Sequence, residues 1–258
     1  MEIITSKNNA SVMAAAKLAD KKYRERERKF AFEGIKLFEE AQKAGIRFSR
    51  VFVTEEAYTK YAEKLSSLDK NILTVVSDAV YEKLSFENAP QGVFSVAEYF
   101  SPKTKKESSF VLLLDGVADP GNFGAILRSA EAFGIDTVYA GKNGADLYNP
   151  KTIRACMGSI FRVDVRRSED IICDIKDLQK NDFHVFATAL DKRSKDIRDV
   201  DFSGKIAFVI GNEGHGVSTE VLDACDGTVI IPMREGPESL NAAVAASVVM
   251  WEAARKRL

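Results

Sequence analysis

The feature that most constrains the fold is an alternation of apolar runs with segments of helical spacing, which begins near residue 110. The runs Phe110–Leu114 and Ile206–Ile210 contain only apolar residues, and the periodicity between them, for example over Asn122–Phe133, is typical of helices. Strands that are apolar on both faces and separated by helices indicate a sheet that is covered on both sides. The sequence therefore predicts an α/β domain with a mostly parallel sheet over residues 110–258.

The expected elements of this half follow one another in a regular order. Strands are predicted at 110–114, 137–140, 184–189, 205–210 and 229–232. Helices are predicted at 122–133, 149–157, 168–180 and 240–257.

A polar, lysine-rich run separates this half from the first hundred residues. We interpret residues 101–109 as an interdomain linker, because they lie between apolar strands. Before them, helices are predicted at 10–19 and 34–44, and strands at 50–54, 72–76 and 92–98. The predicted organisation is a small α/β domain at 1–100, a linker at 101–109 and a larger α/β domain at 110–258.

Composition excludes several classes of protein. The chain has 258 residues, of which 45% are hydrophobic and only 6 are proline, so global disorder is excluded. Its longest apolar stretch, Ala242–Trp251, is too short to span a bilayer, and the N-terminal residues carry no secretion signal. Three cysteines and two histidines form neither a disulfide framework nor a metal-binding pattern. We therefore expect a cytoplasmic protein that binds no metal and does not associate with membranes.

Three glycine-rich turns follow predicted strands, and ligands of parallel sheets bind at such carboxyl ends of strands. The turns span residues 115–124, 211–216 and 231–241. None matches the dinucleotide motif GxGxxG or the P-loop motif GxxxxGK[ST]. Each turn alone could be a simple bend that uses glycine for a positive φ. Together they favour a binding site, because they also carry polar residues such as Asn122, Glu213 and Asn241.

The same turns resemble the three motifs of a known family, the SpoU (TrmH-type) RNA ribose 2'-O-methyltransferases of the SPOUT superfamily. Motif 1 is represented by Asp115-Gly116, Asp119-Pro120-Gly121-Asn122, Gly124 and Arg128. Motif 2 is represented by Gly211-Asn212-Glu213-Gly214 and Gly216, and motif 3 by Ile231-Pro232-Met233, Gly236 and Ser239-Leu240-Asn241. Residues 28–34 and 90–93 resemble the family's N-terminal substrate-binding domain, which has a ribosomal-protein-like RNA-binding fold.

The resemblance implies a cofactor and a chain topology. Enzymes of this superfamily bind S-adenosyl-L-methionine within a deep trefoil knot, which is expected here over residues 205–258, and they form homodimers through this C-terminal domain. The residues expected by position to contact the cofactor or line its pocket are Gly211, Ile231, Leu240, Thr188, Ala189 and Met233. The apolar, small-residue helix expected near the C-terminus suits packing at a dimer interface.

The resemblance also implies a set of candidate catalytic residues around a ribose 2'-hydroxyl. These are Arg128, Asn122, Glu213, Ser239 and Asn241. Arg128 could act as a general base or stabilise a developing alkoxide, and the sequence leaves both roles open. Asn122 could instead be only a helix N-cap, and Glu213 could only cap a turn. Asn122 and Arg128 lie six residues apart, or about 600° of helical turn, so they project from different faces of one helix.

A basic segment suggests how RNA is bound. Residues 21–29 contain six basic and two acidic side chains, which indicates either a solvated helix face or a surface that contacts RNA phosphates. The candidate RNA-binding residues are Lys21, Lys22, Arg24, Arg28 and Lys29. Ribosomal RNA is the favoured substrate by family analogy. The alternatives are a transfer RNA 2'-O-methyltransferase and a catalytically silent RNA-binding or ribosome-assembly factor with the same fold.

Overall fold

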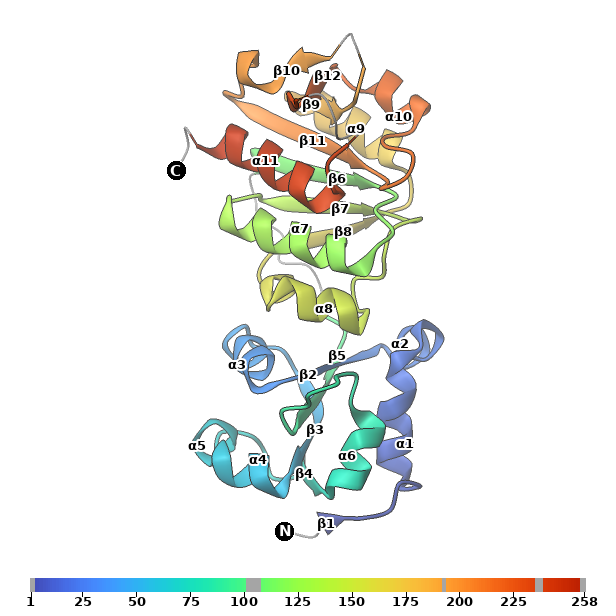
Figure 1. Cartoon of the computed structure of the whole chain (residues 1–258), viewed down its shortest axis with the longest axis vertical. Coiled ribbons are helices and arrows are strands. Elements are labelled where there is room, and N and C mark those ends of the chain that lie inside the picture. The colour runs from blue at the N-terminus through green and yellow to red at the C-terminus, as the bar shows by residue number, and fades with distance from the viewer. Residues whose placement is uncertain (1–2, 101–107, 192–193, 235–238, 256–258) are drawn as a thin grey trace. The chain divides into compact units, whose positions relative to one another are not determined.

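The computed structural model describes residues 3–100, 108–191, 194–234 and 239–255. The chain packs into two compact units, one of Met1–Ser101 with Tyr148–Phe161 and the other of Pro102–Leu147 with Arg162–Leu258 (Figure 1). This division differs from the predicted one in the segment Tyr148–Phe161, which was expected in the larger domain. Residues 101–107 of the expected linker lie outside the described residues.

The first unit contains a mixed five-stranded sheet in the order β1-β4-β3-β5-β2. Its strands are β1 (Ile3–Ile4), β2 (Lys29–Glu33), β3 (Phe48–Thr54), β4 (Leu73–Val76) and β5 (Val93–Glu98). Strand β4 pairs in parallel with β1 and β3, whereas β5 pairs antiparallel with β2 and β3. The first unit is therefore a small α/β domain, as expected.

Short helices surround this sheet. They are α1 (Ala10–Ala16), α2 (Lys21–Glu27), α3 (Ile35–Lys43), α4 (Glu55–Lys60), α5 (Ala62–Leu65), α6 (Asp78–Leu84) and α8 (Pro150–Cys156), with 3-10 turns at Lys17–Ala19 and Ser159–Phe161. Helices α4, α5 and α6 were not predicted, and α4 and α5, with six and four residues, are too short to show helical periodicity.

Helix α8 belongs to the first unit because its flanking residues pack there. The ring of Tyr148 lies 4.8 Å from that of Phe30 in β2, and the ring of Phe161 lies 5.8 Å from that of Phe32. The guanidinium of Arg154 pairs with Glu87 at 2.5 Å. These contacts explain why a segment that is distant in sequence joins this unit.

The second unit contains a seven-stranded sheet in the order β10-β12-β9-β11-β6-β7-β8, in which every recorded pairing is parallel. Its strands are β6 (Phe110–Asp115), β7 (Thr137–Gly141), β8 (Asp164–Ser168), β9 (Phe183–Thr188), β10 (Lys195–Asp196), β11 (Lys205–Gly211) and β12 (Gly227–Ile230). Its helices are α7 (Pro120–Ala132), α9 (Ile171–Lys180), α10 (Thr219–Ala224) and α11 (Ala242–Ala254), with a 3-10 turn at Ile197–Asp199. The predicted parallel α/β fold is confirmed, whereas the trefoil knot stays a prediction.

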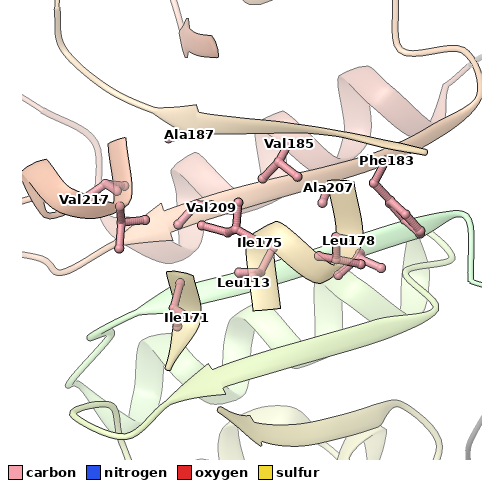
Figure 2. Close-up of a cluster of buried hydrophobic side chains, with 12 residues drawn as sticks. Leu113, Ile171, Ile175, Leu178, Phe183, Val185, Ala187, Ala207, Val209 and Val217 are labelled. Carbon is pink, nitrogen blue, oxygen red and sulfur yellow. The ribbon is translucent and has the colours of Figure 1, made fainter. Parts of the chain in front are cut away.

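Helix α9 covers one face of this sheet (Figure 2). Its apolar residues Ile171, Ile175 and Leu178 recur at spacings of four and three, so they share one helix face. They pack against buried side chains from three strands, among them Leu113, Val185 and Val209. Alternate residues of these strands, such as Leu112 and Phe208, are equally buried, because α7 and α11 lie side by side over the other face (Figure 1).

Several predicted boundaries are wrong by a few residues. The helix expected at 168–180 begins at Ile171, because the side chain of Asp170 caps it by accepting from the amides of Ile172 and Cys173. Ser168 instead ends β8, a strand that was missed because its sequence, DVRRS, is mostly polar. The last helix begins at Ala242 rather than at residue 240. Within the described ranges, no helix combines the length and apolarity that crossing a bilayer requires.

Candidate active site

A cavity of about 490 Å³ lies at the carboxyl ends of β9, β11 and β12. Its walls come from the segments that follow these strands and from the beginning of α11. All six residues predicted to surround the cofactor line it: Thr188, Ala189, Gly211, Ile231, Met233 and Leu240. The volume falls within the usual range for small-molecule sites.

One wall of the cavity is a loop that folds back on Gly211. A Cβ atom at this position would lie 2.0 Å from the carbonyl carbon of Gly216, a distance that unbonded atoms cannot adopt. The backbone amide of Asn212 donates to the carbonyl of Gly216, and the amide of Gly216 donates to the carbonyl of Asn212, each at 2.9 Å. These two hydrogen bonds bring the loop close to Gly211. Gly216 also has a φ of 71°. Residue 211 must therefore be glycine for this wall to form.

Two polar side chains that belong to the motifs but not to the candidate site residues join this loop to the end of β6. The amide nitrogen of Asn212 donates to the carbonyl of Gly116 at 2.8 Å, and its oxygen accepts from the backbone amide of Gly214 at 2.8 Å. The carboxylate of Asp115 accepts from the backbone amide and the hydroxyl of Ser218 at 2.9 and 2.8 Å. The Asn-x-Gly pattern predicts a local turn at Asn212. No local pattern predicts its hydrogen bond to Gly116, which is 96 residues away.

A chain of side-chain hydrogen bonds connects the three motif segments. The Nδ2 atom of Asn122 donates to Oε1 of Glu213 at 2.9 Å, and Nδ2 of Asn241 donates to Oδ1 of Asn122 at 2.9 Å. The partners are 91 and 119 residues apart in the sequence. Three of the five candidate catalytic residues are thus brought together by direct contact.

Asn122 does not cap helix α7, which was the alternative role for this residue. The N-cap of α7 is Asp119, whose carboxylate accepts from the backbone amide of Asn122 at 2.8 Å. The N-cap interpretation of Asn122 is therefore wrong, and its side chain bridges two other residues. Asn241 is the N-cap of α11 and accepts from the amides of Ala243 and Val244 at 2.9 and 3.3 Å.

The carboxylate of Glu213 is held by several donors. Besides Asn122, the backbone amides of Ala118 and Asp119 donate to it at 3.1 and 3.2 Å. Partial burial acts to raise its pKa, but the hydrogen bonds from Asn122 and the backbone outweigh this and hold the pKa below the usual value. The group is ionised at neutral pH and can only accept. It therefore fixes which end of the Asn122 amide faces it, which is a positioning role.

The remaining two candidate catalytic residues lie apart from this chain. Ser239 lines the cavity, as Glu213 does. Arg128 is exposed on α7 and makes no hydrogen bond or ion pair with the residues that the structure describes. As the helical spacing from Asn122 implied, Arg128 does not join the cluster within this chain.

The candidate RNA-binding residues of the first unit divide into two groups. Lys21, Lys22 and Arg28 are exposed and Lys29 is half-buried. Arg24 is only 2% exposed, and its guanidinium donates to the carbonyls of Leu18 and Ala19 at 2.7 Å. The prediction that Arg24 contacts RNA is wrong, because α2 turns this side chain inward, where it satisfies the carbonyls of the preceding turn.

A parallel α/β sheet with a cavity at its strand ends and a fixed polar cluster beside it is typical of a domain that binds a small molecule. Residues 109–251 match the SpoU rRNA Methylase family, and residues 9–95 match the MRM3-like substrate binding domain. The chain belongs to the SpoU rRNA methylase family, which confirms the resemblance found in the motifs.

Individual relatives align over almost the whole chain. The chain is 32% identical over 252 residues, 97% of its length, to 23S rRNA (guanosine(2553)-2'-O)-methyltransferase RlmP of Bacillus subtilis, of which it covers 98%. An AdoMet-bound rRNA methyltransferase from Sinorhizobium meliloti superposes with a TM-score of 0.87 at 28% identity, covering 100% of this chain and 98% of the other. The SpoU methyltransferase AviRb from Streptomyces viridochromogenes, in complex with AdoMet, gives 0.84 at 27% identity, with coverages of 96% and 99%.

Proposed function

We propose that this chain transfers a methyl group from S-adenosyl-L-methionine to a ribose 2'-hydroxyl of structured RNA, with ribosomal RNA as the substrate. The observation that carries the proposal is the cavity, which gathers all six predicted cofactor residues and adjoins the Glu213–Asn122–Asn241 chain. The Bacillus subtilis relative is named as a 23S rRNA methyltransferase, which supports this choice of substrate. Action on such a substrate would also place the protein in the cytoplasm.

The cavity suits a nucleoside-containing ligand. Apolar side chains such as Val229 and Leu240 line it, and the backbone of the Gly211 loop forms a wall with no side chain in between. An adenine ring needs an apolar slot together with backbone donors and acceptors, which such a wall supplies. Two of the similar solved structures contain AdoMet.

The residues of the chain then align the 2'-hydroxyl, whose oxygen would bond to the methyl group as the methyl–sulfur bond breaks and whose proton would pass to solvent. When bound, S-adenosyl-L-methionine supplies a methyl group that is already activated by its positively charged sulfonium, and S-adenosylhomocysteine is the product. Glu213 holds Asn122 and Asn241 in one orientation beside the cavity. A guanidinium is a donor with no acceptor, so we assign Arg128 electrostatic stabilisation of the developing alkoxide or a contact to the neighbouring phosphate.

We also propose that a second copy of the chain covers the apolar face of α11. Val244, Val248 and Trp251 are 49%, 36% and 50% exposed, and they form a shallow apolar depression with Ala125 of α7. Apolar side chains that are exposed together on one helix face favour a contact with another protein surface. Arg128 lies about one helical turn from Ala125 and would therefore lie near this interface.

Light scattering after size exclusion tests the dimer. The wild-type chain should have the mass of a dimer, and Val248→Glu should have the mass of a monomer, because a charge would be buried in the interface. Tyr58→Glu, at a 38%-exposed side chain of the first unit, is the matched control and should stay dimeric. A wild-type monomer, or a Val248→Glu dimer of unchanged affinity, contradicts the proposal.

Methyl transfer tests the reaction and the substrate class together. Labelled S-adenosyl-L-methionine is incubated with separate pools of unmodified ribosomal and transfer RNA, and ribose methylation is then mapped. The proposal predicts label in ribosomal RNA at a single 2'-O-methyl nucleotide. Label only in transfer RNA would show a different substrate class. Transfer to neither pool, nor to precursor ribosomal particles, with cofactor binding intact would favour the silent RNA-binding factor.

A further inference from the structure

Arg28 adopts a backbone conformation that is unusual for a residue with a side chain. It ends α2 in the left-handed region, with φ 53° and ψ 39°, and its amide donates to the carbonyl of Arg24. Glycine is preferred at this position of a helix, because a Cβ atom destabilises the left-handed conformation. Non-glycine residues held in this region concentrate at functional sites. The conformation of Arg28 therefore indicates a functional role for its side chain.

The side chain of Arg28 lies on a stack of aromatic rings. Its Cζ atom is 4.7 Å above the ring centroid of Tyr99, and the rings of Tyr99 and Tyr148 are 3.8 Å apart with an interplanar angle of 17°. Because Tyr148 occupies one face of the Tyr99 ring, the guanidinium takes the other face. Tyr148 is only 9% exposed and packs on the fully buried ring of Phe30. The stack is thus anchored in the core and ends at an exposed cation.

Among the residues that the structure describes, Arg28 has no acidic partner, whereas the nearby Arg26 pairs with Glu27. Arg26 lies over Tyr23 in a similar way, at 4.8 Å, but its guanidinium also pairs with Glu27 at 2.8 Å. Arg28 is exposed, and across the described parts of the chain its guanidinium makes no hydrogen bond or ion pair. All of its N–H donors are consequently available to a ligand. The two arginines form a natural matched pair for experiment.

We propose that an unpaired nucleobase of the RNA substrate stacks on Arg28 and extends the series Tyr148–Tyr99–Arg28 by one layer. Proteins that recognise unpaired RNA stack bases on aromatic rings and on guanidinium planes, and such stacking tolerates any base. A phosphate contact uses the N–H donors at the edge of the guanidinium and needs no ring beneath the cation, whereas stacking uses the flat face that only arginine offers. The ring holds the guanidinium in place before RNA arrives, which reduces the entropy lost on binding. The inference rests on the proposed function only in taking RNA as the ligand.

Fluorescence of a modified RNA tests this stack in the full-length protein. The probe is a single-stranded oligouridylate of about ten nucleotides with one central 2-aminopurine, whose emission falls when it stacks. Affinity and quenching are compared for wild type, Arg28→Lys, Arg28→Gly and the control Arg26→Lys. Glycine at position 28 relieves the left-handed conformation, so the thermal midpoint of Arg28→Gly should not fall, and any loss of binding is not unfolding.

The expected pattern separates stacking from simple charge attraction. Wild type should quench the probe, Arg28→Gly should bind about tenfold more weakly or worse without quenching, and Arg28→Lys should lose the quenching with a smaller loss of affinity. Arg26→Lys should stay within about twofold of wild type in both respects. The proposal is overturned if wild type does not quench the probe, or if Arg28→Lys retains wild-type quenching, which would indicate a phosphate contact only.

Methyl transfer to ribosomal RNA by the same proteins separates this inference from the proposed function. If wild type methylates RNA but no quenching depends on Arg28, the stack is wrong and the function stands. If quenching depends on Arg28 and no methyl transfer occurs to any RNA, the function is wrong and the stack stands.

Discussion

Glutamine in place of Glu213 would preserve the shape of the side chain and remove its charge and one acceptor. Oε1 accepts from Asn122 and from the amide of Asp119, and Oε2 accepts from the amide of Ala118. A glutamine oxygen can occupy only one of these positions, so its NH2 group must face an N–H donor at the other. The better orientation keeps the two bonds at Oε1, loses the bond to Ala118 and places two donors against each other.

The size of the effect follows from these bonds. A hydrogen bond to a charged group contributes about 1.5–3 kcal/mol and a neutral one about 1 kcal/mol, with the lower values applying at an exposed site. One lost bond and two weakened ones therefore sum to about 2 kcal/mol, or about thirtyfold in an equilibrium or rate constant. We expect Glu213→Gln to lower kcat/KM for methyl transfer by about five- to thirtyfold. The measurement is steady-state methyl transfer, with calorimetry of S-adenosyl-L-methionine binding alongside it.

A double-mutant cycle shows whether the effect passes through Asn122. Asn122→Asp alone should be severely impaired, because it places a second carboxylate against Glu213. In the double variant, the glutamine NH2 can donate to the new carboxylate, and Asn241 can still donate to its other oxygen. The double variant should therefore be more active than Asn122→Asp. Equal or lower activity of the double variant would refute the hydrogen bond as the structure shows it.

Three further outcomes follow from single positions. Gly211→Ala should weaken S-adenosyl-L-methionine binding, measured by calorimetry, at least about a hundredfold, because its Cβ would meet the backbone of the folded-back loop. The control Gly214→Ala should bind normally, because its Cβ would lie 3.5 Å from its nearest neighbour. Arg24→Ala should lower the free energy of unfolding in urea by about 2–3 kcal/mol, since two carbonyls lose their partner, and Lys22→Ala should change it by less than about 0.5 kcal/mol. The lowered pKa of Glu213 means that its carboxylate stabilises the folded chain fully above the unfolded pKa, and that this contribution is lost as pH falls through the folded pKa. The difference in unfolding free energy between wild type and Glu213→Gln should accordingly shrink in acid, and a difference that is constant down to about pH 3 would contradict the assignment.

Sequence patterns predicted those features that depend on local spacing. Runs such as Phe110–Leu114 are apolar at every position and alternate with segments of helical spacing, which is typical of strands buried on both faces, so the parallel sheet could be predicted. The glycine-rich turns located the cavity because ligands of parallel sheets bind at the carboxyl ends of the strands. Arg24 could not be placed, because a segment in which six of nine residues are basic does not reveal which side chain turns inward. The packing of Tyr148 on Phe30 likewise depends on tertiary contacts that no local pattern encodes.

The direction of the hydrogen bonds explains why the site uses a carboxylate and two amides rather than an apolar contact. Glu213 can only accept, so the amide of Asn122 must present nitrogen to it and oxygen to Asn241. Asn241 must then present nitrogen to Asn122, which leaves its oxygen to cap α11. A single fixed charge thus determines the orientation of two amides and the start of the helix that follows Leu240, a residue of the cavity wall. Apolar packing would bring the same three segments together without setting any of these directions.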